Sequence, residues 1–255
     1  MVKNSIFIFS HQDDEFGLYN IIEKQIEEKK NIIIIYLTSG YNISINKFRF
    51  SKRDKESLMV LLNLGVKKKN IYFIGRKLNI KIYDLYKHLN IVYNHVNLII
   101  KKLKNKSLIF THAWEGGNED HDACYVIVKK IILKNKNILS YYQFSQYHGH
   151  KTFFLPFKIQ EHFQSNTKLF HIKINFTKKI KYIRYLFSYV SQKYLWLPVY
   201  PFIILKILSN NYGKLIEIDK NSLVKKPHKG KLLYEKMRKN KFTKLNKFFQ
   251  NFLKK

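Results

Sequence analysis

Acidic residues are scarce in this chain of 255 residues, which has 17 Asp and Glu against 48 Lys and Arg and a formal net charge of +31. The excess is uneven, because residues 1–122 carry 20 basic and 13 acidic side chains whereas residues 123–255 carry 28 and only 4. A field of this sign favours anionic partners such as nucleic acid, phosphorylated substrates or an anionic membrane surface. The alternative explanation is a coding bias that spreads lysines over solvated faces without a function.

Cysteine and long apolar runs are also lacking. The single cysteine, Cys124, excludes an internal disulfide and favours a reducing, cytoplasmic location. Residues 6–10 are too short and too soon followed by charges for a signal peptide, so we expect none. The most apolar later stretch, residues 194–205, is about half the ~20 residues that span a bilayer, and it contains two prolines. Core packing, a partner interface and peripheral contact with an anionic membrane stay open for this stretch.

Short apolar runs alternate with segments of helical spacing in the first half of the chain. Strands are expected at residues 6–9, 32–37, 70–74, 108–110 and 139–144, and helices at about 16–30, 50–64, 86–103 and 120–133. This alternation predicts an α/β fold, with a Rossmann-like, mostly parallel sheet and helices on both faces. The first loop lacks Gly-x-Gly-x-x-Gly, which excludes a nicotinamide enzyme.

Beyond residue 150 the pattern loosens. A helix is expected at residues 178–191, a strand at 215–218, and a packed amphipathic helix, rather than a nucleic-acid arm, in the basic tail 228–255. Repeats and low-complexity linkers are missing from the sequence. We therefore predict one domain over residues 1–255, with an α/β core at 1–150 and a basic, helical C-terminal elaboration at 151–255.

The few carboxylates are concentrated where chemistry is expected. Seven of the 17 lie in two short clusters, at residues 13–15 and 115–122, and each cluster follows a predicted buried strand. The carboxyl ends of parallel strands meet at one edge of a sheet, so the two clusters can close on one site. A bound cation accounts for such crowding of negative charge.

A hydrolytic zinc site needs three protein ligands and an open position for water. His11 and Asp14 lie three residues apart, His121 can supply the third ligand, and Asp13 stays free to take a proton from the bound water. Taken singly, Asp13, Asp14 and Asp120 could instead cap the helices that follow them.

The two clusters resemble the metal motifs of a known family. Residues 11–15, His-Gln-Asp-Asp-Glu, are similar to the His-Pro-Asp-Asp-Glu motif of the LmbE-like, or PIG-L, zinc deacetylases, and residues 112–123 resemble the second metal motif of that family. Weaker matches at 38–40, 53–56, 64–66 and 189–192 extend the resemblance over about residues 5–192. The resemblance implies a zinc-dependent hydrolase that removes the N-acetyl group of an amino-sugar derivative. One Zn²⁺ per chain would be held by His11, Asp14 and His121, with Asp13 as general base.

Other roles carried over from the family are less direct. Arg53 either holds substrate or pairs with Glu56. Asn118 stands where many members have a histidine, and it can donate a hydrogen bond to an oxyanion but cannot act as an acid. Protonation of the leaving amine then returns to Asp13. His112 is the second candidate for that step and a candidate for contacting the substrate.

Three functions therefore compete. The leading one is deacetylation of an N-acetylated amino sugar that is phosphate-, nucleotide- or lipid-linked. The second is a basic, metal-stabilised module that binds nucleic acid through the lysine-rich half. The third is a deacetylase-like protein without turnover.

Overall fold

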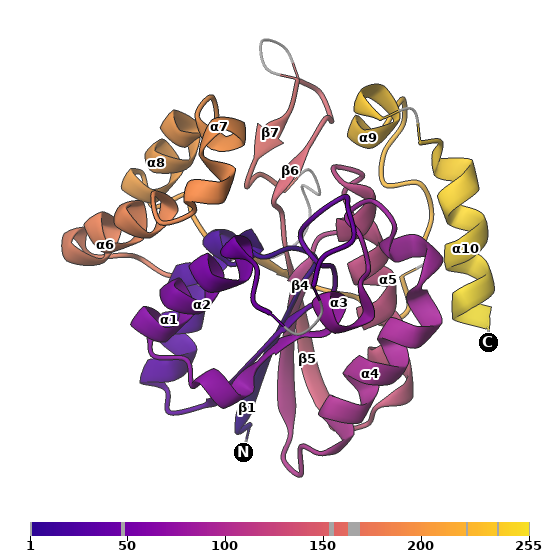
Figure 1. The fold of residues 1–255 in the computed structure, drawn as a ribbon, viewed down its shortest axis with the longest axis horizontal. Coiled ribbons are helices and arrows are strands. Elements are labelled where there is room, and N and C mark those ends of the chain that lie inside the picture. The colour runs from indigo at the N-terminus through magenta and orange to yellow at the C-terminus, as the bar shows by residue number, and fades with distance from the viewer. Residues whose placement is uncertain are drawn as a thin grey trace.

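The computed structural model describes residues 2–46, 49–152, 156–162, 169–222, 224–238 and 240–254. Its main sheet has seven strands in the order β3-β2-β1-β4-β5-β9-β8 (Figure 1). The parallel part of the sheet comprises β3 (Ile71–Phe73), β2 (Asn31–Tyr36), β1 (Asn4–Phe9), β4 (Ser107–His112) and β5 (Ile138–Phe144). Two short strands, β9 (Leu215–Glu217) and β8 (Leu169–Phe170), extend it in the antiparallel sense. The predicted α/β fold with a mostly parallel sheet is confirmed.

The helices of the first half lie close to their predicted positions. They are α1 (Tyr19–Glu27), α2 (Lys52–Leu64), α4 (Leu89–Lys101) and α5 (Glu119–Lys134), with the short α3 (Ile74–Leu78) after β3. Short 3-10 helices precede α1, β3 and α4, namely η1 (Asp14–Leu18), η2 (Lys68–Asn70) and η3 (Leu85–Lys87). Helix α2 begins at a capping box formed by Ser51 and Asp54, and it ends at Gly65, whose φ of 101° is typical of a glycine C-cap.

The alternating direction of successive side chains along the strands divides the hydrophobic core into two layers, one on each face of the sheet. On β1, Ile6 and Ile8 belong to the cluster that includes α4, α5 and α10, whereas Phe7 and Phe9 belong to the cluster that includes α1, α2, α6 and α8. Successive side chains of a strand point to opposite faces, so each face of the sheet acquires its own apolar layer. Helices therefore cover both faces, as Figure 1 shows.

The second half of the chain packs onto this core. It contributes α6 (Phe176–Leu186), η4 (Val190–Gln192), α7 (Lys193–Trp196), α8 (Tyr200–Leu208), α9 (Leu233–Met237), α10 (Phe242–Lys254) and the hairpin of β6 (Tyr147–His148) and β7 (Lys158–Ile159). Four side chains of α10 are buried, Phe242, Leu245, Phe249 and Phe252, which confirms the packed amphipathic helix. The helix expected at 178–191 ends at Leu186, and a 3-10 turn follows. Among the described residues no helix combines the length and apolarity that crossing a membrane requires.

The strand order creates a crevice. The chain runs β1, β2, β3 in one direction from β1 and then resumes at β4 on the other side of β1. At such a switch point the loops after the two central strands diverge and leave a crevice at the carboxyl edge of the sheet. Both carboxylate clusters lie in that position, directly after β1 and β4.

Candidate metal centre and its pocket

The first motif turns sharply between β1 and η1. The amide of His11 donates to Oδ2 of Asp14 at 2.7 Å, which closes the turn. Asp13, between these two residues, has a φ of 118°, a backbone conformation that residues other than glycine rarely adopt. The adjacent carboxylates of Asp13 and Asp14 consequently reach different partners: the first meets Arg53 and the second meets histidines.

The second motif starts helix α5. The side-chain oxygen of Asn118 accepts from the amide of Asp120 at 2.9 Å, so Asn118 is the N-cap. The alternative in which Asp120 caps this helix does not hold, because the Asp120 carboxylate turns toward the first motif and contacts Nε2 of His11 at 3.0 Å. The first turn of α5 then places His121 opposite Asp14.

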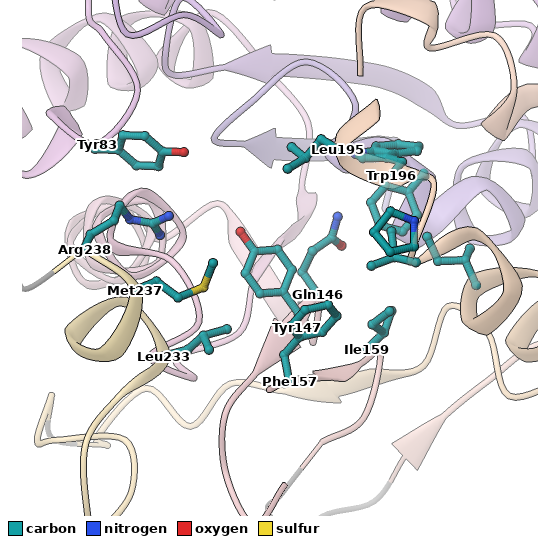
Figure 2. A pocket seen from close by; sticks show the side chains of 14 residues that line it. Tyr83, Gln146, Tyr147, Phe157, Ile159, Leu195, Trp196, Leu233, Met237 and Arg238 are labelled. Atoms are coloured by element: carbon teal, nitrogen blue, oxygen red, sulfur yellow. The ribbon is translucent and has the colours of Figure 1, made fainter. Parts of the chain in front are cut away.

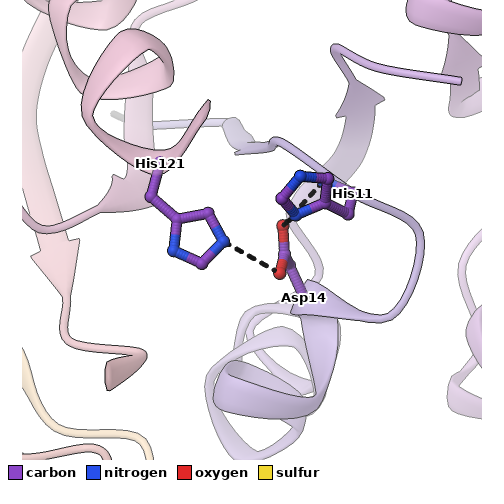
Figure 3. A group of neighbouring side chains, drawn as sticks. All are labelled: His11, Asp14 and His121. Carbon is purple, nitrogen blue, oxygen red and sulfur yellow. Dashed lines mark hydrogen bonds and ion pairs between the residues drawn. The ribbon is translucent and has the colours of Figure 1, made fainter. Parts of the chain in front are cut away.

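His11, Asp14 and His121 form one buried cluster, in which one ligand atom from each residue lies within 4.8 Å of the others (Figure 3). Oδ1 of Asp14 is 3.4 Å from Nε2 of His121, and Oδ2 is 3.4 Å from Nδ1 of His11. Asp14 thus lies between the two imidazoles, one from each motif. The prediction that these three residues meet at the sheet edge is confirmed.

The electrostatics of the cluster follow from burial and from the carboxylates. Burial lowers the pKa of His11, but Asp14 and Asp120 outweigh it and raise that pKa to about 9. Burial and the neighbouring His112 lower the pKa of His121 to about 3. For Asp14, burial alone would raise the pKa, but the three surrounding histidines hold it well below the usual range.

His112 lies behind this cluster rather than in the pocket. Its ring stacks on His121 with centroids 3.9 Å apart, its Nε2 is 3.0 Å from Oδ2 of Asp14, and it is fully buried. The residues that line the pocket do not include it. The expectation that His112 contacts substrate does not fit this position, which suits support of the ligands.

The donor set fits zinc. Two imidazoles and one carboxylate are a common ligand set of catalytic zinc, which keeps its fourth position for water. Neither ring nitrogen of His121 has a hydrogen-bond partner although both are buried, and a metal ion would satisfy one of them. Asp120 engages Nε2 of His11, which leaves Nδ1 for the ion, and carboxylate support of this kind is usual for metal-binding histidines.

Asp13 is held by Arg53 beside the cluster. One terminal nitrogen of Arg53 donates to both carboxylate oxygens of Asp13 at 2.7 and 2.8 Å, while its other donors reach the carbonyls of Gln12 and Gly40, each at 2.7 Å. Burial raises the pKa of Asp13 to about 7, although Arg53 acts in the opposite direction. Pairing of Arg53 with Glu56 was expected as one alternative and is wrong, because Glu56 instead accepts from Ser191.

A polar pocket of about 140 Å³ opens onto the cluster. The sequence-predicted residues His11, Asp13, Asp14, Arg53 and Asn118 line it. Further lining residues come from other elements and were not anticipated, namely Phe16, Ile82, Tyr83, Gln146, Tyr147, Gln192, Leu195 and Trp196. The pocket is therefore built by both halves of the chain.

Tyr147 is fixed at the pocket wall by two buried groups. The side-chain nitrogen of Asn118 donates to its hydroxyl oxygen at 2.9 Å, and the carboxylate of Glu115 accepts from its amide at 3.1 Å. Gly117 lies against this strand so closely that a β-carbon would clash with the Tyr147 carbonyl. The absence of a side chain at Gly117 thus permits this close approach of backbone.

An apolar cavity of about 320 Å³ adjoins the polar pocket (Figure 2). The two share Tyr147, Gln146, Tyr83, Leu195 and Trp196, among others. Aliphatic and aromatic side chains form most of the remaining wall, which consists of Phe157, Ile159, Pro198, Val199, Ile203, Leu233, Met237 and Arg238. A molecule in the polar pocket can consequently extend an apolar group into this cavity.

The C-terminal segment folds back over the second motif. Arg238 forms an ion pair with the buried Glu119 at 2.8 Å, and the amide of Leu233 donates to the carbonyl of Gly116 at 2.9 Å. These contacts bring α9 to the cavity wall. His228 does not reach the metal cluster, because its ring lies beside His150, with centroids 4.8 Å apart.

The strand order and the buried histidine–carboxylate cluster define a class: doubly wound α/β proteins with a candidate metal centre at the switch point of the sheet. Residues 6–132 match the PIG-L family model, described as GlcNAc-PI de-N-acetylase. The chain belongs to the PIG-L, or LmbE-like, family, as the two motifs implied. No sequence among the curated proteins matches it.

Solved structures with the same fold include several deacetylases. The zinc-inhibited form of teicoplanin deacetylase is 13% identical, with a TM-score of 0.61 over 86% of this chain and 100% of its own. The N,N'-diacetylchitobiose deacetylase of Pyrococcus horikoshii is 16% identical, with a TM-score of 0.59 over 86% of this chain and 84% of its own. The A40926 pseudoaglycone deacetylase is 10% identical, with a TM-score of 0.60 over 88% and 100%. At these identities the likeness concerns the fold.

Proposed function

We propose that this protein is a zinc-dependent hydrolase that removes the N-acetyl group from an amino-sugar derivative. The observation that carries the proposal is the buried cluster of His11, Asp14 and His121 at the floor of a pocket whose wall includes Asp13. The family description and the deacetylases that share the fold support this reaction class. The zinc-inhibited teicoplanin deacetylase indicates that zinc interacts with that protein, and zinc is the metal that the donor set here suits.

The residues around the cluster have the properties that the hydrolysis needs. Zinc in this position would bring the pKa of a coordinated water to about 7 and polarise the acetamide carbonyl. Asp13 accepts the proton of the attacking water, since burial raises the pKa of its carboxyl group and so makes the carboxylate a stronger base. Arg53 keeps the Asp13 carboxylate in place with two hydrogen bonds and is better described as a positioning residue than as a substrate ligand.

Asn118 acts through Tyr147 in this proposal. Its oxygen is used in capping α5 and its nitrogen donates to the Tyr147 hydroxyl, so the hydrogen of that hydroxyl is directed elsewhere. Tyr147 lines the pocket, where it can donate to the developing oxyanion or to a sugar hydroxyl. Asp13 then returns its proton to the leaving amine.

Acetate release from N-acetylated amino sugars by the zinc-loaded protein tests the reaction. Asp13→Asn should lower kcat by about 10²–10⁴ while zinc content stays at one per chain, because Asp13 is not a ligand. Asp84→Asn, a half-buried carboxylate that pairs with Lys87 and does not line the pocket, is the matched control and should keep full activity. Nucleic-acid binding unaffected by Asp13→Asn, together with no acetate release by the wild type, would favour the binding-module alternative.

The cavity favours a substrate whose sugar carries an apolar substituent. Among the described residues that line the polar pocket and the apolar cavity, the only lysine or arginine residues are Arg53 and Arg238. Each of them is paired with a carboxylate. A free phosphate or nucleotide group would therefore find no cation available there, whereas an alkyl or aryl group would be buried. Of the three linkages predicted from net charge, the lipid-like one fits these walls best.

A comparison of octyl and methyl N-acetylglucosaminides as substrates tests whether an apolar substituent is preferred. Each methylene that leaves water contributes about 0.8 kcal/mol, so partial burial of the octyl chain should raise kcat/KM by about 10²-fold or more. Met237→Asp places a carboxylate at the cavity wall on an exposed side chain and should remove this preference without changing turnover of the methyl glycoside. Equal kcat/KM for the two glycosides in the wild type would contradict an apolar subsite.

A further inference from the structure

Helices α7 and α8 leave a band of apolar side chains in solvent. We call this the apolar ridge, and it comprises Tyr194, Leu195, Leu197, Phe202, Leu205 and Leu208. The exposed fractions reach 89% for Tyr194 and 61% for Leu205. On α8 the exposed residues recur at helical spacing while Tyr200, Ile203 and Ile207 face the core, so both faces of this helix are apolar. A solvated helix would carry polar residues on that outer face.

The chain segment that carries the ridge is basic, although Lys178 and Lys181 pair with Glu23 and Lys206 pairs with Glu161. From residue 162 to residue 216 the sequence contains nine Lys and Arg residues and no Asp or Glu. A protein partner chosen by charge would need an acidic, apolar surface, and nucleic acid would gain little from exposed leucines. The surface of a bilayer with anionic lipids offers both requirements at once, since apolar side chains enter the acyl boundary and lysines meet the headgroups.

A second basic feature lies at the same edge of the molecule. A hollow of about 240 Å³ between the β6–β7 turn and the loop before α9 is lined by basic side chains. We call it the basic hollow, and its cationic residues are Lys151, Lys229, Lys231 and Lys236. His150 and His228 also line it, but burial lowers the pKa of each. Figure 1 shows α7–α8, the β6–β7 hairpin and α9 side by side along the edge opposite the N-terminus. Asp and Glu are missing from the lining of this hollow.

The apolar cavity lies next to both features, since Leu195 of the ridge lines it and Met237 of its wall directly follows Lys236 of the hollow. Leu195 and Pro198 on one side and Met237 on the other line the cavity and are themselves exposed, so its mouth lies between α7 and α9. We propose that this edge docks on an anionic lipid bilayer, with the apolar ridge inserted at the interface and the basic hollow on lipid phosphates. Docking would turn the mouth of the cavity toward the membrane. This inference concerns a partner and holds or fails independently of the proposed hydrolysis.

Vesicle flotation of the full-length protein tests the docking. The wild type should float with phosphatidylcholine–phosphatidylglycerol vesicles, should not float with phosphatidylcholine alone, and should dissociate as salt rises. Tyr194→Ser with Leu205→Ser should weaken partitioning about tenfold, whereas Ile91→Ser with Leu98→Ser, an exposed apolar pair on α4, should leave it unchanged.

Charge-reversal variants distinguish a specific contribution of the basic hollow to vesicle binding from an effect of the net charge of the whole protein. Lys229→Glu with Lys231→Glu should weaken partitioning about 30-fold or more, and Lys101→Glu with Lys102→Glu, which changes net charge equally on the far side, should have a much smaller effect. Equal losses for both pairs, or no flotation of the wild type, would overturn the proposal. A stable dimer that the ridge substitutions dissociate would assign the ridge to a second copy of the chain and would overturn it as well.

Discussion

Asp120 provides the sharpest test of how the metal centre is held. Its carboxylate accepts from the amides of Tyr83 and Leu85 at 2.6 and 3.1 Å while it contacts Nε2 of His11 at 3.0 Å. Oδ2 serves His11 and Tyr83, and Oδ1 serves Leu85. In Asp120→Asn, one oxygen becomes an NH₂ group that cannot accept, so at least one buried N–H loses its partner and the negative charge behind His11 is lost.

The magnitude follows from these contacts. An unsatisfied buried amide should lower the free energy of unfolding by about 1–3 kcal/mol. Loss of the carboxylate that orients a histidine ligand should weaken zinc affinity by about 10–100-fold. Competition with a chromophoric zinc chelator measures the affinity, and chemical denaturation of the metal-free protein measures the stability separately.

Asp122→Asn is the matched control for this experiment. Asp122 lies on the same helix and is equally buried, but it accepts from the amide of Gly116 and touches no proposed ligand. Burial raises its pKa to about 8, so it is mostly neutral at pH 7 and an amide is a close replacement. Zinc affinity should therefore stay at the wild-type value. If Asp120→Asn also keeps wild-type affinity, either His11 is no ligand or Asp120 does not orient it.

Three further predictions concern the same structure. Phe249→Ala on α10 should lower the free energy of unfolding by about 3–5 kcal/mol, since the ring is fully buried, while Phe248→Ala, 41% exposed, should cost much less in the same denaturation assay. Burial lowers the pKa of His148 from 6.5 to about 4, so as the pH falls the unfolded chain binds a proton at this residue before the folded chain does. The free energy of unfolding should therefore fall by up to ~3 kcal/mol between pH 6.5 and 4. His148→Gln should flatten that part of the plot of unfolding free energy against pH. Arg53→Lys keeps the charge but loses the paired hydrogen bonds to Asp13, so kcat should fall about tenfold or more at unchanged zinc content; an unchanged kcat would remove Arg53 from the positioning of the base.

The parallel part of the fold could be predicted because each element there carries its own signal. Strands β1 and β2 are continuous apolar runs, and α2 is bounded by a capping box and a glycine. The strands β6 to β8 are only two residues long and have no periodicity to detect, so they exist through pairing with distant segments. The four-residue helix α7 is similarly too short to leave a pattern.

The proposed metal ligands could be identified from the sequence for a related reason. His11 and Asp14 follow one strand, His121 follows another, and parallel topology alone brings the two strand ends together. The role of Asp120 stayed open because its place at the start of α5 is also where a capping carboxylate is found. Its contact with His11, 109 residues away, depends on how the α5 terminus meets the β1 loop, which no local pattern records.

The pocket walls show why the ligands are easier to predict than the substrate. Every proposed ligand and the base come from the first 121 residues, on elements anchored by the central strands β1 and β4. The cavity, by contrast, takes Tyr147, Ile159, Trp196, Leu233 and Met237 from segments placed by tertiary packing alone. Under the proposed function, the chemistry depends on the switch point of the sheet and the specificity depends on the elements packed around it. The two motifs therefore suffice to predict a reaction class, whereas the choice of substrate depends on cavity walls that only the folded chain reveals.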